Sequence, residues 1–339
     1  MSMRNRYNLS WTELLNEFIH KSYKLCFVNK NSRWSGDIFL DVVEETGRIS
    51  KDQEYIKYLI RKSDPLFIGR LGAVEMTAFL NYLQINNKLP NSEQFKIGKY
   101  YMDKVLPNWW SVGSQRSMCN NAGFFPASPE NLTKWGVLME KDIKDVDILL
   151  RWLKNEKLLL PLNMNMNFLA YRNIEYPFLF LNPYIEALEG MKVLVISPFS
   201  ETIKHQYELI DKIWSIKAMC PKYELKTLQS YNILRGNNKD ADVRTWFDAL
   251  KKMEEKISNI DFDIALIGCG AYAFHLGAFI KRMGKKAITT CGSTQLLFGI
   301  YGNRWAEFLK EKGIYNGYWT RPFDTKPKGY EKVENAAYW

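Results

Sequence analysis

The sequence lacks several features that define large classes of proteins. No apolar run approaches the roughly 18 residues that span a bilayer, and the polar start MSMRNRYNLS has no signal-peptide core. The chain has 339 residues but only three histidines and five cysteines, without a C-x-x-C pair. A zinc site is therefore not expected, and scattered cysteines in odd number are typical of reduced thiols. These absences favour a cytoplasmic globular protein.

Acidic residues are fewer than basic ones, 37 against 47, which gives a formal net charge of +10. An excess of positive charge favours anionic partners such as nucleotide phosphates, and it also suits work at the inner face of the cell membrane. The basic residues are spread thinly, mostly within helical patterns, and no reader fold for nucleic acid is recognisable. Nucleic acid is therefore not an expected partner.

The most informative stretch contains a strand, a glycine turn, a helix and a second strand. Residues 262–267 are apolar and predict the first strand, which Gly268-Cys-Gly270 ends. Residues 271–283 predict a helix with an apolar face, and 285–290 predict the next strand. In such a βαβ unit the helix N-terminus offers backbone N–H groups and a positive dipole end to a phosphate.

The glycine turn partly fits the pattern of dinucleotide-binding proteins. Gly268, Gly270 and Ala273 match G-x-G-x-x-[GA]. In NAD enzymes an acidic residue about 20 positions further on holds the ribose. Residues 289–291 read Thr-Thr-Cys and supply no carboxylate, which counts against NAD. A second interpretation stays open, in which the glycines only let helix and strand pack closely.

A second strand, glycine turn and helix is predicted at 65–83. Arg70 and Glu75 flank the mouth of its turn. A guanidinium there can clamp a phosphate or carboxylate, and a carboxylate can act as a base or metal ligand. An Arg70–Glu75 ion pair that ties down the turn explains the same residues. The pattern alone does not decide between the two.

The remaining pattern predicts an α/β array. Ser200 is a natural N-cap for the helix that follows it. The pair Asn120-Asn121 is either a loop former or a group that binds sugar hydroxyls, and the closing Tyr338-Trp339 is expected to fold back on the body. We predict helices at 129–153, 201–216 and 240–257, strands at 191–197 and 223–229, and connecting structure at 163–189.

Strands joined through helices in this way are parallel, so the expected fold is a Rossmann-like parallel sheet with flanking helices. We expect residues 1–60 to form an N-terminal helical segment, 61–189 an N-terminal α/β part and 190–339 a C-terminal nucleotide-binding part of one compact unit. Ligands in such sheets bind beyond the carboxyl ends of the strands. This rule gathers 198–200, 268–272 and 290–295 at one edge.

Several stretches resemble a bacterial family associated with surface-polysaccharide synthesis. They are GRLGAVE at 69–75, NNAGFFP at 120–126, KVLVISPF at 192–199, DIALIGCGAYAFHLGAFIKRMGKKAI at 263–288, QLLFGIYGNRW at 295–305 and ENAAYW at 334–339. More distantly, the layout is similar to glycosyltransferases of the GT-D fold type. Those enzymes carry an R-x-G-D-G-E segment and a later strand, glycine turn and helix that hold a nucleotide diphosphate.

This resemblance can be carried over by position. Arg70, Gly72 and Glu75 match the arginine, first glycine and glutamate of the segment, but Ala73 and Val74 replace its aspartate and second glycine. The aspartate belongs to a D-x-E metal motif, and a divalent ion is usually held by more than one carboxylate. The resemblance therefore leaves open whether manganese or magnesium (Mn²⁺ or Mg²⁺) binds at Glu75, whether Glu75 acts alone as a base, or whether activity is lost.

The resemblance implies transfer of a sugar from a nucleotide-diphosphate donor of the UDP or GDP type to a surface-polysaccharide or lipid-linked glycan acceptor. Glu75 and Arg70 are the expected catalytic residues. Two alternatives remain: a Rossmann-type methyltransferase or other nucleotide-cofactor enzyme, and a non-catalytic component of a polysaccharide-synthesis complex. The residues expected to contact the nucleotide sugar are Gly72, Pro198, Ser200, Gly268, Gly270, Ala271, Tyr272, Thr290, Gly292, Ser293 and Gln295.

Overall fold

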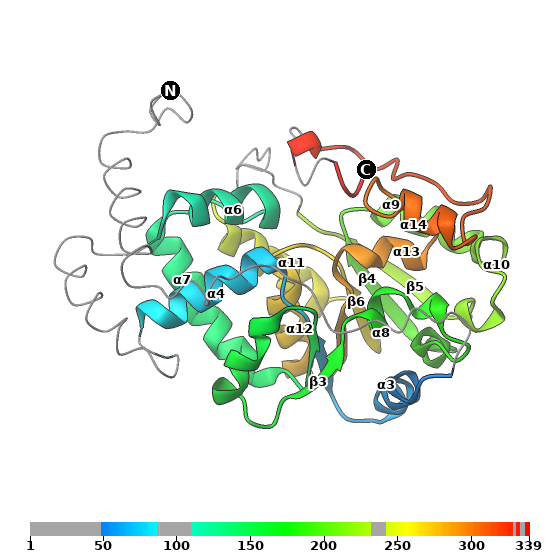
Figure 1. Ribbon diagram of the computed structural model, residues 1–339, viewed down its shortest axis with the longest axis horizontal. Helices are drawn as coiled ribbons and strands as arrows, with labels where there is room; N and C mark the ends of the chain where they lie inside the picture. The colour runs from blue at the N-terminus through cyan, green and yellow to red at the C-terminus, as the bar shows by residue number, and fades with distance from the viewer. Residues whose placement is uncertain (1–48, 87, 89–109, 232–241, 328–329, 333–335) are drawn as a thin grey trace.

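The protein is built on one seven-stranded parallel sheet of order β3-β2-β1-β7-β6-β4-β5. The computed structural model (Figure 1) describes residues 49–86, 88, 110–231, 242–327, 330–332 and 336–339. The parallel sheet with flanking helices confirms the predicted α/β, Rossmann-like fold. The strands are β1 (Leu66–Gly69), β2 (Ile148–Arg151), β3 (Asn167–Ala170), β4 (Lys192–Ser197), β5 (Glu224–Gln229), β6 (Ile264–Ile267) and β7 (Lys286–Thr289).

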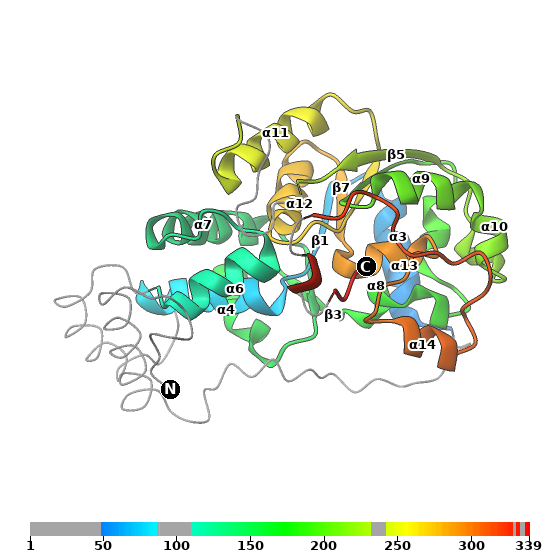
Figure 2. The ribbon, with the colours of Figure 1, turned by 90° about the horizontal axis from the view of Figure 1, so that it is seen from above.

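Helices cover both faces of this sheet (Figures 1 and 2). Central strands such as β6 are therefore buried throughout and read as continuous apolar runs. One buried cluster forms under α4 (Ala73–Ile85), α6 (Val112–Ala122), α7 (Pro129–Asp142), α11 (Trp246–Ser258) and α12 (Tyr272–Arg282). The opposite cluster forms under α3 (Lys51–Arg61), α8 (Arg172–Glu175), α9 (Ser200–Glu208), α10 (Ile210–Ile213), α13 (Thr294–Leu297) and α14 (Ala306–Glu311).

Short 3₁₀ helices complete the connections. They are η2 (Ile143–Asp145), η3 (Lys154–Leu162), η4 (Pro177–Leu179), η5 (Tyr184–Leu188), η6 (Lys217–Met219), η8 (Cys291–Ser293) and η9 (Tyr330–Lys332). Among the described helices, none is long and apolar enough to cross a membrane. Of the predicted N-terminal helical segment, residues 1–48 lie outside the described residues.

Local sequence explains the helix starts that the pattern predicted. Ser128 accepts a hydrogen bond from the Asn131 backbone N–H, with Pro129 as the first residue of α7. At α11, Thr245 and Asp248 form a capping box, each side chain accepting from the backbone N–H of the other. Both helices begin where side chains satisfy backbone donors that have no partner within the helix.

The sequence interpretation missed two strands. The predicted helix at 129–153 was wrong beyond residue 142, because the chain turns at η2 and continues as β2. The stretch at 163–189, interpreted as connecting structure, contains β3. Both strands have only four residues, and Ile148, Leu149 and Leu150 are buried on both faces of the sheet. A short apolar run of this kind is indistinguishable from a buried helix segment by periodicity alone.

The start of α9 also differs from the prediction. Ser200 is the first helical residue rather than the N-cap, and its hydroxyl bonds to Gln229. The carboxylate of Asp324 accepts instead from the N–H groups of Glu201 and Thr202, at 3.0 and 3.1 Å. The prediction failed because a residue from the distant C-terminal segment supplies the cap.

The helices that follow two neighbouring strands lie on opposite faces of the sheet. The chain after β4 enters α9 on one face, whereas the chain after the adjacent β6 enters α12 on the other. The same holds for the next such pair, since β7 leads to α13 and β1 leads to α4. Such switch points open a crevice at the carboxyl ends of the strands. The topology therefore directs attention to this edge.

Candidate functional site

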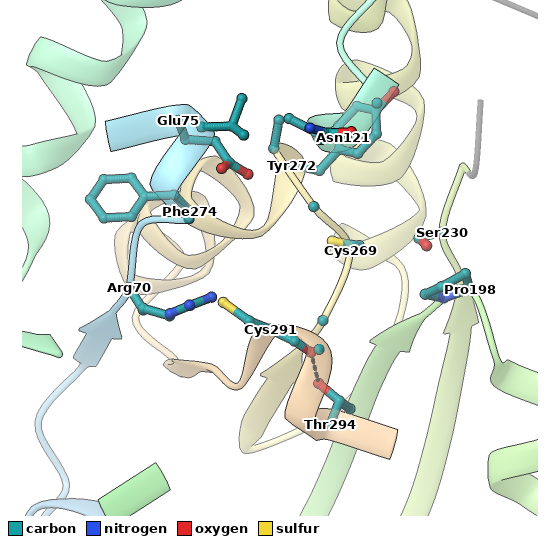
Figure 3. A pocket seen from close by; sticks show the side chains of 18 of the residues that line it. Arg70, Glu75, Asn121, Pro198, Ser230, Cys269, Tyr272, Phe274, Cys291 and Thr294 are labelled. Atoms are coloured by element: carbon teal, nitrogen blue, oxygen red, sulfur yellow. Dashed lines mark hydrogen bonds between the residues drawn. The ribbon is translucent and has the colours of Figure 1, made fainter. Parts of the chain in front are cut away.

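A cavity of about 210 Å³ lies at the carboxyl ends of β1, β4, β5, β6 and β7. Arg70 and Gly270, predicted from separate stretches, line the same cavity. Figure 3 shows Arg70 and Tyr272, which come from these two stretches. The cavity is thus the place where the two strand–glycine–helix units meet. The predicted site residues that line it are Arg70, Gly72, Glu75, Pro198, Gly268, Gly270, Ala271, Tyr272, Gly292 and Gln295.

Three predicted contact residues lie behind the cavity wall instead. Ser200, Thr290 and Ser293 are buried and are not among the lining residues. The Ser293 hydroxyl donates to the Thr290 carbonyl at 2.6 Å, and the Thr290 hydroxyl bonds to that of Thr294. Their polar groups therefore shape the loop after β7.

Packing within the protein accounts for both glycines of the β6–α12 turn. A Cβ on Gly268 would lie 2.1 Å from the Thr294 Oγ1 and 2.3 Å from the Cys291 carbonyl oxygen. Gly270 has a φ of +59°, and a Cβ there would lie 2.9 Å from the Ala122 carbonyl oxygen. The close-packing interpretation is therefore sufficient for the glycines. The start of α12 has no side-chain cap, although the Ala271 N–H donates to the Ala122 carbonyl at 3.1 Å and the Ala273 N–H to the Gly270 carbonyl at 3.0 Å.

The β1–α4 turn is built differently. Gly72 is the N-cap of α4 with an ordinary φ of −68°, and no side chain caps this helix. A Cβ on Gly72 would lie 2.1 Å from the Glu75 Oε2, so the carboxylate folds back over the helix start. The predicted alternative of an Arg70–Glu75 ion pair was wrong, since Arg70 forms no ion pair with any described carboxylate. Both side chains line the cavity.

Two aromatic rings pack against Arg70. Its guanidinium carbon lies 4.1 Å from the Trp152 ring centroid and 4.2 Å from that of Tyr171. The end of the guanidinium points towards the Cys291 thiol (Figure 3). Its Nε is buried and has no hydrogen-bond partner. Burial raises the pKa of the Cys291 thiol, although the neighbouring Arg70 acts against that shift.

The two rings are themselves held in place. The Trp152 Nε1 donates to the Leu71 carbonyl at 2.8 Å, which ties β2 to the β1–α4 turn. The Tyr171 hydroxyl lies 3.2 Å from the Thr290 carbonyl oxygen, which ties β3 to the loop after β7. Buried Glu156 accepts from the Trp152 backbone N–H at 3.0 Å. Burial raises the pKa of this carboxyl group to about 7, against the effect of its backbone donors.

Within the described ranges, no group of three or more His, Cys, Asp or Glu side chains could hold a metal ion by itself. Ala73, at the position of the aspartate in the resembled motif, lines the cavity but offers no ligand. The expectation of Mn²⁺ or Mg²⁺ at Glu75 therefore gains no support from these side chains.

The C-terminal segment supplies cavity residues that the sequence did not reveal. Arg304, Tyr338 and Trp339 line the cavity, and an Arg304 nitrogen lies 3.1 Å from the Tyr338 hydroxyl. The Tyr338 ring occupies the space beside Gly292, where a Cβ would lie 2.5 Å away. The Trp339 ring packs edge-on against Phe199 with centroids 4.9 Å apart. The predicted folding back of the tail is confirmed, but only the structure brings it to the cavity.

Comparisons with known proteins gave one relative at a distance. A shikimate dehydrogenase (NADP(+)) of Nitrosopumilus maritimus (strain SCM1) is 28% identical over 135 residues, which is 39% of this chain and 46% of that enzyme. The match thus spans less than half of the relative. No protein-family model matches the chain, and no solved structure matches it. The similarity links the Rossmann-like sheet to an enzyme that uses a nucleotide cofactor.

Proposed function

We propose that this protein transfers a sugar from a nucleotide-diphosphate donor of the UDP or GDP type to a surface-polysaccharide or lipid-linked glycan acceptor. One observation carries the proposal. A turn with charged side chains, Arg70 and Glu75, and a turn with an uncapped helix start, Gly268 to Tyr272, line one cavity. Sugar transfer needs both kinds of group, a base for the acceptor and donors for the departing diphosphate.

In the proposed arrangement the donor lies along the sheet edge. The nucleoside lies at the ends of β5 and β4, against Tyr231 and Pro198. The diphosphate lies at the start of α12, where backbone N–H groups and the helix dipole favour negative charge. The sugar then lies at the ends of β7 and β1, near Glu75. Pockets that enclose a drug-sized ligand measure roughly 300–1,000 Å³, so the nucleoside extends along the rim.

In this arrangement Glu75 accepts the proton of the acceptor hydroxyl. The hydroxyl oxygen forms the new bond to the anomeric carbon of the sugar, while the bond from that carbon to the diphosphate oxygen breaks. The diphosphate leaves with the electron pair, and the start of α12 and Arg304 stabilise its charge. No step requires a metal ion.

A binding panel tests the proposal. UDP- and GDP-sugars, NADP⁺ and S-adenosylmethionine are compared by thermal shift, each with and without Mn²⁺. A ligand at 100 times its Kd stabilises the native state by about 2.7 kcal/mol, so one class of nucleotide sugar should raise the Tm by several degrees. Stabilisation by S-adenosylmethionine alone would favour a methyltransferase and overturn the proposal. Donor binding without turnover in any acceptor screen would favour a non-catalytic component.

An NADP-dependent oxidoreductase is the second candidate. The similarity to the shikimate dehydrogenase favours it, as do the glycine turn and the position of Arg70 beside Cys291. In Rossmann enzymes an arginine near the end of the strand after the turn accommodates the 2′-phosphate of NADP. Enhanced NADPH fluorescence on binding, with no response to nucleotide sugars, would select this candidate. Contact with the inner membrane also stays a proposal, which vesicle sedimentation tests.

A further inference from the structure

Arg70 is a partly buried cation whose carboxylate neighbour, Glu175, does not pair with it directly. Its Nε is buried without a partner, and it forms no ion pair with a described carboxylate. Glu175 interacts with it only electrostatically; burial raises the pKa of Glu175, and Arg70 lowers it. A buried charge of this kind is costly unless an anion completes it. Because Arg70 lines the cavity, a ligand can supply that anion.

The guanidinium group itself indicates the shape of the anion. The Trp152 and Tyr171 rings pack against it, with their centroids 4.1 and 4.2 Å from its carbon. The Cys291 thiol beside its nitrogens is a weak acceptor, which a ligand oxygen would replace. A planar group with two oxygens, presented edge to edge, matches this fork best.

The position of Arg70 indicates which part of the donor carries this group. Arg70 lies at the β1 end of the cavity, with the start of α12 between it and Pro198 at the β4 end (Figure 3). On the proposed function, the diphosphate occupies the start of α12 and the sugar lies beyond it. We propose that Arg70 binds a carboxylate on the transferred sugar, so that the donor is a nucleotide-linked uronic acid. This inference rests on the proposed function.

A matched pair of ligands tests this assignment. UDP-glucuronic acid and UDP-glucose differ at C6, which is a carboxylate in one and a hydroxymethyl group in the other, and UDP reports the nucleotide part alone. Isothermal titration should give the uronate a Kd about 10- to 100-fold lower than that of the hexose, as expected for a charge-assisted hydrogen bond. Arg70→Gln should abolish the difference and leave the Kd of UDP unchanged.

Two variants serve as controls. Arg172 stacks on Tyr176 at 5.7 Å but does not line the cavity, so Arg172→Gln should keep the preference for the uronate. Arg70→Lys keeps the charge without the planar fork and should retain only part of it. The Tm of each ligand-free variant checks folding. If Arg70→Gln does not fold, Arg70→Lys and the preference of the unaltered protein still decide.

The possible results separate this inference from the proposed function. Equal affinity of the unaltered protein for the two UDP-sugars overturns the inference. So does a loss of affinity in Arg70→Gln that is as large for UDP as for the UDP-sugars, because it would assign Arg70 to the diphosphate. If UDP and GDP compounds fail to bind and NADP⁺ binds, the proposed function fails. In that case free D-glucuronate and D-glucose become the probes. If glucuronate but not glucose stabilises the protein, and Arg70→Gln abolishes this effect, Arg70 is part of a carboxylate site. If glucuronate does not stabilise the protein, there is no such site.

Discussion

The two glycine turns that line the cavity have similar sequences, but they present different chemical groups to a ligand. At the β6–α12 turn, the glycines are required because backbone and side-chain atoms of Ala122, Cys291 and Thr294 press against them. At the β1–α4 turn, Gly72 makes room for the carboxylate of Glu75. One turn offers a ligand only its backbone, whereas the other offers charged side chains.

This difference teaches how to interpret such motifs. A glycine pattern alone reports a close approach of chains, which can be internal packing as well as a ligand. The charged turn is more informative, because the buried Nε of Arg70 has no partner even though two aromatic rings pack against the guanidinium. The predictions that follow separate the two turns experimentally.

Glu75→Gln should have the largest effect and act on the charged turn alone. Removal of a general base lowers the rate by about 100- to 10,000-fold, while the start of α12 still binds the nucleotide. Initial rates of donor consumption at saturating donor, together with the donor Kd, check this. An unchanged rate would exclude Glu75 as the base, and a lost affinity would make it a binding residue.

The stability of the protein should depend on pH through Glu156, which holds the backbone at Trp152 beside the charged turn. Its pKa is raised from 4.5 to about 7 in the folded protein, so the folded state holds a proton that the unfolded state has released. The free energy of unfolding should therefore fall by about 3 kcal/mol as the pH rises through this interval. Urea unfolding at several pH values measures the slope. Glu156→Gln should remove it; a slope that persists would point to another group.

Gly268→Ala should damage the backbone turn. The new Cβ would meet the Cys291 carbonyl oxygen, which belongs to the main chain and cannot turn aside. We expect a loss of about 2–3 kcal/mol in the free energy of unfolding and weaker nucleotide binding. Gly317→Ala is the control, because no atom lies within 4 Å of its Cβ position. Equal stability of the two variants would show that the loop after β7 can shift away from the new Cβ at little energetic cost.

Gly72→Ala should have the smallest effect on stability. The φ of −68° suits alanine, and the new Cβ would meet only the flexible end of Glu75. We expect the free energy of unfolding to change by less than about 1 kcal/mol. The rate should fall about 10-fold because the carboxylate is displaced. Unfolding and rate measurements on one preparation test both; an unchanged rate would show that the position of Glu75 is not critical.

The sequence predicted those parts of the site that depend on local pattern. Strands β1, β4, β6 and β7 carry strong apolar runs followed by glycine or proline, and the rule for parallel sheets brings their ends to one edge. Gly268 was found in this way, whereas Arg70 and Glu75 came from the glycine turn at 65–83 and from the resemblance to GT-D glycosyltransferases. The same rule also included Ser200, Thr290 and Ser293, which are buried and do not line the cavity. For Ser200, residue type alone could not reveal that Asp324 caps α9.

The rest of the site depends on contacts between distant segments. Trp152 and Tyr171 reach Arg70 only because β2 and β3 extend the sheet beyond β1, and both strands were missed. The tail reaches the cavity through Tyr338 against Gly292, a contact with no local signal. Trp152 and Tyr171 each lie one position after a missed strand, so the sequence interpretation could not assign them to this edge.

The pairing of β1 with β7 has a consequence for folding during synthesis on the ribosome. Ile68 pairs with Ile288, which lies 220 positions later in the chain. While the ribosome is still making the second half, the first strand has an open edge and Arg70 has no Cys291 beside it. Contacts of such long range form slowly and leave nascent chains exposed to misassembly. A chaperone that shields this edge until residue 289 has emerged would raise the yield of active protein.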